Sequence, residues 1–551
     1  MTETVGPSST HGAGAGPTAR PSILLAAILL AVVVVPTGVS GTGVALPHIA
    51  GDLGSQPASL QWVVNAFNLT FAMFSLVAGS IADHVGRRRG LLLGGAVFAI
   101  AAVVSALAPS LLVLDVARAL AGVGAAIIFA CSGALLAITF SGKQATRAFA
   151  LFGTAAGVGL GLGPSISSAA IALVGWSGIF WFNAVVIAVS LALVIASRVH
   201  DSPASESGRL DYRGAAVFAA SLTLIIAGVA QSNTWGWSAP GTAVMIAAGI
   251  VLLGVFGWLQ LHTTNPLLDL RLLRSPRLVG LLMVPVAGAV GFVTLLTYYP
   301  TFLSTVWELG SGAVGAVMLI MTVPVIVGPL VAGALHNRGV PEWVILGGSV
   351  VLFVIGAALL TRMGTTVNVA GLVVPFALLG LGFGLGVGLV DGQAIGSVPE
   401  EKSGMVSGLV STVRLGSEAV VVAVFAGALT AGVGASVRHI LPASMASDQQ
   451  REIVDRVVTG ETGHLDPAVS VDAVRTAFAD GMVPLLWALT VVSAVLAAVI
   501  IALLVRRAPE VADDASASAP DLAEQDSNPR PDENRQQQPV QYSTTIERFD
   551  S

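Results

Sequence analysis

A chain of 551 residues, of which 54% are hydrophobic and only 10% charged, is too apolar for a soluble protein, where roughly a quarter of residues carry charge. The net charge of -5 depends on acidic residues after position 507, so the apolar part of the chain is slightly basic. A single cysteine excludes an internal disulfide and a cysteine-built metal site. We therefore expect an all-α polytopic membrane protein.

About fourteen apolar stretches are long enough to cross a bilayer as helices. We take the first as a spanning helix rather than a secretory signal, because it is too long and no small-residue cleavage site follows it. The stretches lie at about 22–46, 58–82, 90–108, 111–138, 146–172, 178–198, 214–233, 241–261, 279–302, 312–335, 342–361, 368–391, 405–430 and 483–505.

Basic residues fall on alternate connecting loops, from Arg87 near the start to Arg507 near the end. The short loops of the other set hold almost none. Basic loops face the cytoplasm, so we expect an even number of spans with both termini cytoplasmic, in a bacterial inner (plasma) membrane.

The loops divide the chain into five expected parts. Six-helix bundles at 22–200 and 279–507 flank an inserted helix pair at 201–278, an arrangement of repeats common in transporters. The second bundle includes an outside loop at 432–482, with short surface helices at 448–459 and 470–480. A cytoplasmic arm at 1–21 and an acidic cytoplasmic tail at 508–551 should be disordered, and we prefer a solvated tail to a binding segment.

The turn after the second stretch reads G-S-I-A-D-H-V-G-R-R-R, from Gly79 to Arg89. It resembles the signature loop of the major facilitator superfamily of secondary transporters. An ordinary positive-inside loop would explain the arginines but not the spacing of the glycines and the acid. The resemblance implies a gate whose charged side chains bond across to the other bundle when the cytoplasmic side is shut. Its residues would be Gly79, Asp83, Gly86, Arg87, Arg88 and Arg89.

Glycine occupies every second position along part of the fifth stretch, and the last of these glycines is followed by a proline, Gly163-Pro164. This resembles the antiporter motif of exporters, in which Gly159, Gly163 and Pro164 would kink the helix and pack it tightly. Ser167 and Ser168 stand where a glycine pair is usual. The resemblance favours export, and fourteen spans resemble the fourteen-helix drug:proton antiporter branch. Generic small-residue packing is the alternative.

Arg118 lies inside the fourth stretch, in a segment that resembles the second motif of the family, near the coupling pathway. A buried arginine requires a partner, and Asp115 lies one turn away. The alternative is that Arg118 extends to the outer membrane interface. Ala121 replaces the usual glutamine.

The end of the first stretch, Gly41 to Ile49, also resembles the fourteen-helix branch, but Gly38 stands where that branch has an aspartate. A proton carrier must then lie elsewhere, or coupling differs. Glu418 is the best candidate, because Arg414 lies four residues before it on the same helix face and the two can pair. An inert ion pair is the alternative.

Trp62, Asn65 and Asn68 recur every third residue and form a polar stripe, and Tyr298 lies in the outer part of the ninth stretch. Such residues in an apolar cavity suit bulky lipophilic or cationic compounds. Contacts between helices or anchoring at the interface are the alternatives.

Together these features predict a proton-coupled exporter of lipophilic or cationic small molecules that works by alternating access. Its partners would be the substrate, protons and the bilayer, with no cofactor, metal or nucleic acid, and it would act as a monomer. The same fold could export a lipid, an amino acid or a self-made antibiotic. A membrane enzyme or an ATP-driven pump is disfavoured, because the sequence has neither a G-x-x-x-x-G-K-[ST] loop, nor H-E-x-x-H, nor a soluble domain for a nucleotide.

Overall fold

The computed structural model describes residues 20–53, 60, 62–199, 201, 211–237, 239–440, 449–450, 453–454, 456–457 and 470–506. Most of the expected arm at 1–21, the tail at 508–551 and most of the surface helix at 448–459 lie outside these residues. Fourteen helices among the described residues are long and apolar enough to cross a membrane, which confirms the predicted count.

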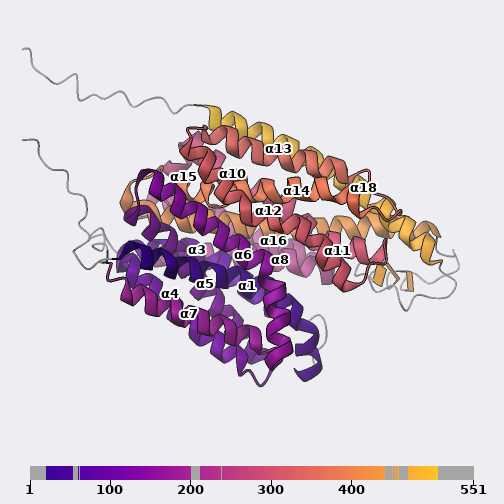
Figure 1. Cartoon of the computed structure of the whole chain (residues 1–551), viewed down its shortest axis with the longest axis horizontal. Helices are drawn as coiled ribbons and strands as arrows, with labels where there is room; N and C mark the ends of the chain where they lie inside the picture. The colour runs from indigo at the N-terminus through magenta and orange to yellow at the C-terminus, as the bar shows by residue number, and fades with distance from the viewer. Residues whose placement is uncertain are drawn as a thin grey trace, which may run out of the picture. The chain divides into compact units, whose positions relative to one another are not determined.

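The first six of these helices pack into one group (Figure 1). Within it, α1 lies along α6, both α3 and α4 pack on α5, and α7 contacts α1 and α4. Their bounds are α1 Pro21–Leu53, α3 Trp62–Val85, α4 Arg87–Ala106, α5 Leu111–Thr139, α6 Gly142–Val174 and α7 Gly178–Ala196.

The last six form the second group, in which two spans are irregular. One changes to a π-helical turn in its middle, and the other breaks between α14 and α15 at Gly388, whose φ of 81° suits glycine. The bounds are α10 Pro276–Gly288, η2 Ala289–Val293, α11 Thr294–Thr305, α12 Ser311–Asn337, α13 Glu342–Leu360, α14 Val369–Gly386, α15 Leu389–Ile395, η3 Glu400–Lys402, α16 Ser403–Ile440 and α18 Val471–Val505.

Two further helices, α8 Tyr212–Trp235 and α9 Pro240–His262, form a hairpin, and η1 Leu270–Arg274 follows it. α8 packs on α9 with one face and contacts both α3 and α16 with another. The two groups meet along two seams, α3 with α16 and α6 with α12. The inserted pair therefore lies against the α3–α16 seam.

The expected outside loop at 432–482 is shorter in the structure. α16 continues to Ile440, and the segment 470–480, predicted as a separate surface helix, is the first part of α18. Gly481 indicated a helix end in the sequence, but it lies inside α18. A Cβ there would come within 2.8 Å of the Val433 backbone, so this glycine permits close contact between α18 and α16.

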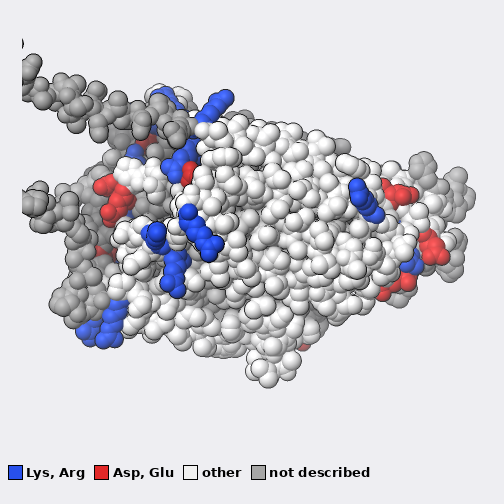
Figure 2. All heavy atoms as spheres, turned by 45° about the horizontal axis from the view of Figure 1, so that its top comes forward, with Lys and Arg blue, Asp and Glu red and all other residues white. Residues whose placement is uncertain are grey.

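Charged side chains gather at the ends of the helices, and in the view of Figure 2 most Lys and Arg side chains lie toward one end of an otherwise white surface. Arg87, Arg277, Arg338 and Lys402 stand at helix ends on this side, which we call the arginine end. The other side is called the opposite end. An uncharged middle is what a hydrocarbon environment requires of a lipid-facing surface.

Candidate transport site

Asp83, near the end of α3, binds the first residues of α16. Its Oδ1 accepts a hydrogen bond from the Gly404 backbone N–H at 3.1 Å, and its Oδ2 accepts one from Met405 at 3.0 Å. The first N–H groups of a helix have no partners within the helix and carry partial positive charge, so a carboxylate is stabilised there. Asp83 thus joins the first group of helices to the second at the arginine end.

Arg87 adds a second link to the same seam. Its guanidinium lies 3.3 Å from Asp83 and 3.3 Å from the Glu400 carboxylate, and it also donates to the Glu400 carbonyl. Gly79 makes the approach possible, because a Cβ there would overlap the carbonyl oxygen of Gly404. The predicted bonds across the two groups are present for these residues, while their role in gating stays a prediction.

Arg88 and Arg89 do not reach the second group. Their backbone N–H groups donate to the two carboxylate oxygens of Asp201 at 2.9 and 3.1 Å, and this carboxylate caps α4. The Arg89 side chain is 73% exposed. Gly86 has a φ of 100°, and a Cβ there would lie 2.7 Å from Asp201. Of the three arginines, only Arg87 matches the predicted bond across the seam.

Two more ion pairs lie at the arginine end. Lys402 lies 2.7 Å from Asp269, and this hydrogen-bonded ammonium holds the pKa of the Asp269 carboxyl below its usual range. Arg277 binds Glu342 through two nitrogens, at 2.6 and 2.8 Å. The first pair ties the segment after the inserted hairpin to the start of α16.

A cavity of about 570 Å³ lies between the two groups of helices. All four residues predicted to contact substrate line it: Trp62, Asn65, Asn68 and Tyr298. The Tyr298 hydroxyl donates to the Val422 carbonyl at 3.2 Å, so this polar group already has a partner on α16. The remaining lining is mostly apolar, as expected of a site for small organic molecules. Their part in binding stays a prediction.

Arg414 and Glu418 also line this cavity, but they do not form the predicted pair. Arg414 binds the Asp391 carboxylate of α15 at 2.8 Å instead. Glu418 makes no hydrogen bond or ion pair within the described part of the chain. The cavity wall thus carries an arginine paired with Asp391 and a carboxylate that feels the arginine's charge but has no hydrogen bond or ion pair among the described residues.

Asp391 was not predicted, although the sequence held a signal for it. It is the last residue of the apolar stretch predicted at 368–391 and is 5% exposed. Ionisable residues within spans are functional candidates by default. The break at Gly388 begins the short helix that carries this carboxylate, and the Gly388 N–H donates to it at 3.4 Å.

Arg118 is buried, with 1% of its surface exposed, so it does not extend to the interface. Nor does it pair with Asp115. Its guanidinium donates to the carbonyls of Val63, at 3.0 Å, and Gly38, at 2.8 Å, and lies over the Phe67 ring at 4.4 Å. Buried Oδ1 of Asp115 has no hydrogen-bond partner among the described residues. The predicted burial of Arg118 is confirmed, whereas its pairing with Asp115 and its extension to the interface are wrong. The role of Arg118 and Asp115 in proton coupling stays a prediction.

The antiporter-motif segment has the close packing that the resemblance implies. A Cβ at Gly159 would overlap the Val33 carbonyl of α1, and one at Gly163 would overlap the Ser40 hydroxyl. Pro164 lies within α6, which stays helical from end to end. Ser167 stands where a glycine was usual and donates to the Gly41 carbonyl at 2.7 Å, so its hydroxyl holds α6 against α1.

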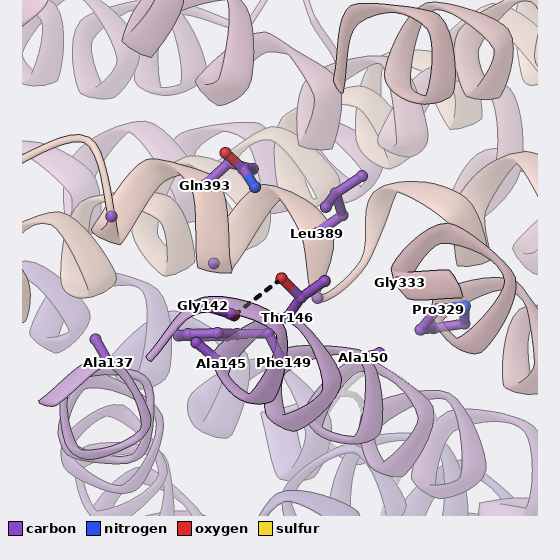
Figure 3. Close-up of a pocket in the computed structure, with 13 residues that line it drawn as sticks. Ala137, Gly142, Ala145, Thr146, Phe149, Ala150, Pro329, Gly333, Leu389 and Gln393 are labelled. Carbon is purple, nitrogen blue, oxygen red and sulfur yellow. Dashed lines mark hydrogen bonds between the residues drawn. The ribbon is translucent and has the colours of Figure 1, made fainter. Parts of the chain in front are cut away.

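A second cavity lies at the seam between α6 and α12. Figure 3 shows a smaller cavity of about 220 Å³ between α6, α12 and α15, in which Thr146 donates to the Gly142 carbonyl at 3.4 Å. It shares no lining residue with the larger cavity. Gly333 lines it, and the sequence from Gly333 to Gly339 faintly resembles the signature loop that begins at Gly79. Asp83 lies four residues after Gly79, but the residue four positions after Gly333 is Asn337, which has no charge.

Among the described residues, no group of three or more His, Cys, Asp or Glu side chains could hold a metal ion. The chemistry available at the large cavity is therefore that of a carboxylate, an arginine–aspartate pair, two amides, and aromatic and aliphatic surface. These groups can bind and release a molecule or a proton.

Comparison with known proteins gives a consistent result. The model of the Major Facilitator Superfamily matches residues 28–422. Multidrug resistance protein Stp of Mycobacterium tuberculosis is 30% identical over 419 residues, 75% of this chain and 77% of that protein. Cephamycin export protein CmcT of Amycolatopsis lactamdurans is 32% identical over 428 residues, 75% of this chain and 86% of that protein.

Multidrug efflux pump LfrA of Mycolicibacterium smegmatis is 26% identical and covers 84% of this chain and 92% of its own length. Among solved structures, the human organic anion transporter MFSD10 matches with a TM-score of 0.53 at 15% identity. The match covers 85% of this chain and 99% of that one, and it supports the fold alone. The family match, the fourteen helices and the cavity between two groups of helices agree: the chain is a multi-pass membrane transporter that belongs to the Major Facilitator Superfamily.

Proposed function

We propose that this protein is a proton-coupled exporter of lipophilic or cationic small molecules, of the multidrug type. The observation that carries the proposal is the cavity of about 570 Å³ with the unpaired Glu418 carboxylate on its wall. The relatives, which include a multidrug efflux pump and a cephamycin export protein, support export. The antiporter-motif glycines Gly159 and Gly163, followed by Pro164, support the same direction.

Glu418 is the proposed meeting point of proton and substrate. A charged carboxylate in a mostly apolar cavity is costly unless a cation or a proton neutralises it. The two neutralising partners therefore compete for one group, and this competition couples proton entry to substrate release. Arg414 acts on Glu418 only through its charge, because its hydrogen bond goes to Asp391.

The arginine end is proposed to face the cytoplasm, because basic residues concentrate on its short loops. Both termini would then be cytoplasmic, in a bacterial inner membrane, and the protein would act as a monomer. Because α3 is joined to α16 at that end, this arrangement would be the state that releases substrate outward. Uptake from the cytoplasm requires Asp83 to leave α16 and Arg87 to leave Glu400 of η3, so that the two groups rock about the cavity.

Substitution of Glu418 by glutamine should abolish proton-driven export, because an amide keeps the shape of the side chain but neither binds a proton nor neutralises a cation. The measurement is uptake of a fluorescent cationic dye into inside-out vesicles, driven by an imposed proton gradient. Glu401→Gln is the matched control, since it makes the same chemical change on an exposed side chain. Unchanged transport and pH dependence in Glu418→Gln would show that another group carries the proton.

A further inference from the structure

Helix α8 of the inserted pair contributes directly to the large cavity. Ile226, Ala227 and Ala230 of α8 line it, together with residues of both six-helix groups. A hairpin that only connected the two groups would have no reason to touch the cavity. The role of α8 is therefore a question about the transport site itself.

The packing explains why α8 reaches the cavity. At the arginine end, α3 and α16 meet backbone to backbone: a Cβ at Gly79 would overlap Gly404, and one at Gly408 would overlap Ser75. Farther along, Asn65 of α3 lines the cavity, as do several residues of α16. Here the cavity lies between the two helices, and α8, which contacts both, supplies part of its wall.

Two contacts hold α8 against this part of the cavity. Its Thr223 hydroxyl lies 3.4 Å from the Met73 sulfur of α3. At the opposite end, Trp237, just beyond α8, packs so closely on α16 that a Cβ at Gly427 would overlap its indole nitrogen. α8 is thus attached to both of these helices.

The second helix of the hairpin supports α8 from outside. Gly228 of α8 lies against Met245 and Ile246 of α9, with an added Cβ 3.0 Å from each side chain. A Cβ at Gly249 would come within 2.9 Å of the Ser221 carbonyl on α8. Glycine at these positions lets the two helices approach closely, so α8 cannot easily move outward to admit a larger ligand.

We propose that α8 forms a wall of the substrate cavity and limits the width of the molecules that are exported, with Ala227 and Ala230 as the residues that set this limit. This inference rests on the proposed function. The methyl groups of the two alanines leave room that a larger side chain would occupy. Because the wall is apolar, it selects by shape and contact area rather than by charge, and substrates should share a hydrophobic body that fits beside it.

Ala227→Phe and Ala230→Phe test the proposal, with export of two cations as the readout: bulky tetraphenylphosphonium and flatter ethidium. Either substitution should lower tetraphenylphosphonium export about tenfold or more while changing ethidium export about threefold or less, within the range that contacts in apolar pockets produce. Ala247→Phe on α9 is the matched control, because Ala247 is exposed. It should change neither substrate.

Ile226→Ala shortens a side chain of the same wall and so widens the cavity. It should raise the export of tetraphenylphosphonium relative to ethidium. Equal loss of both cations in the phenylalanine variants, or export of both as in the parent protein, would overturn the role of α8. A parent protein that exports neither cation under a proton gradient would overturn the proposed function, and this inference with it. The amount of each variant in the membrane and its thermal stability are measured as well, because a misfolded variant would lower both and a narrowed cavity would not.

Discussion

Replacing Asp83 with asparagine should lower export about tenfold or more, because hydrogen bonds to a charged group are worth roughly 1.5 to 3 kcal/mol each. The carboxylate accepts from two backbone N–H groups of α16 and contacts Arg87. An amide has one acceptor oxygen and no charge, so it cannot satisfy both N–H groups. The closed arginine end becomes less stable, and transport fails because the cycle needs both states. Dye transport in vesicles measures the loss.

Asp201→Asn is the matched control for this substitution. Asp201 also accepts from two backbone N–H groups at the start of a helix, but its partners, Arg88 and Arg89, lie in the same group of helices. Its loss should reduce stability without opening the seam between the groups. Equal effects of the two substitutions on transport, at equal amounts of protein, would mean that the Asp83 contact is only structural.

Replacing Arg414 with glutamine should destabilise the protein by about 3 to 5 kcal/mol, since removing one partner of a buried ion pair leaves the other charge uncompensated. Asp391 is 5% exposed and loses its 2.8 Å partner in this variant. Asp391→Asn should lower the free energy of unfolding by a similar amount, because it leaves the Arg414 charge without its partner. Thermal unfolding of the purified protein in detergent measures both changes.

The double variant, with Asp391→Asn and Arg414→Gln together, decides whether these two residues act as a pair. It removes both charges, so it should recover most of the stability lost in either single variant. If the double variant instead loses as much stability as the two single variants together, the two side chains are not coupled. Arg414 would then be available to Glu418, which is the pairing that the sequence predicted.

The sequence was sufficient for features that depend on neighbouring residues. Fourteen spans follow from the lengths of apolar stretches, which reflect the thickness of the bilayer. The family resemblance carried by Gly79, Asp83 and Arg87 implied a contact between the two helix groups, and the structure has one. The stripe of Trp62 and Asn65 faces a cavity as expected, because residues three apart share a helix face.

Pairings between distant segments could not be predicted in this way. Local spacing favoured Glu418 for Arg414, but the tertiary fold brings Asp391 closer, from a helix broken at a glycine. Arg118 binds backbone carbonyls, which no side-chain pattern reveals. Gly481 indicated a helix end and proved to be a packing contact, because the two roles of glycine look alike in sequence.

The central claim is that the α3–α16 contact closes the arginine end and must open during each transport cycle. Spin labels on cysteines introduced at Val85 and Glu401, two exposed positions beside the Arg87–Glu400 contact, report this directly, since the native Cys131 is fully buried. Pulsed electron–electron double resonance should give a short distance between the two labels in the resting protein. A second, longer distance should appear when substrate is present. Asp83→Asn should enrich the longer distance. A single short distance that neither substrate, nor pH, nor Asp83→Asn alters would contradict the claim.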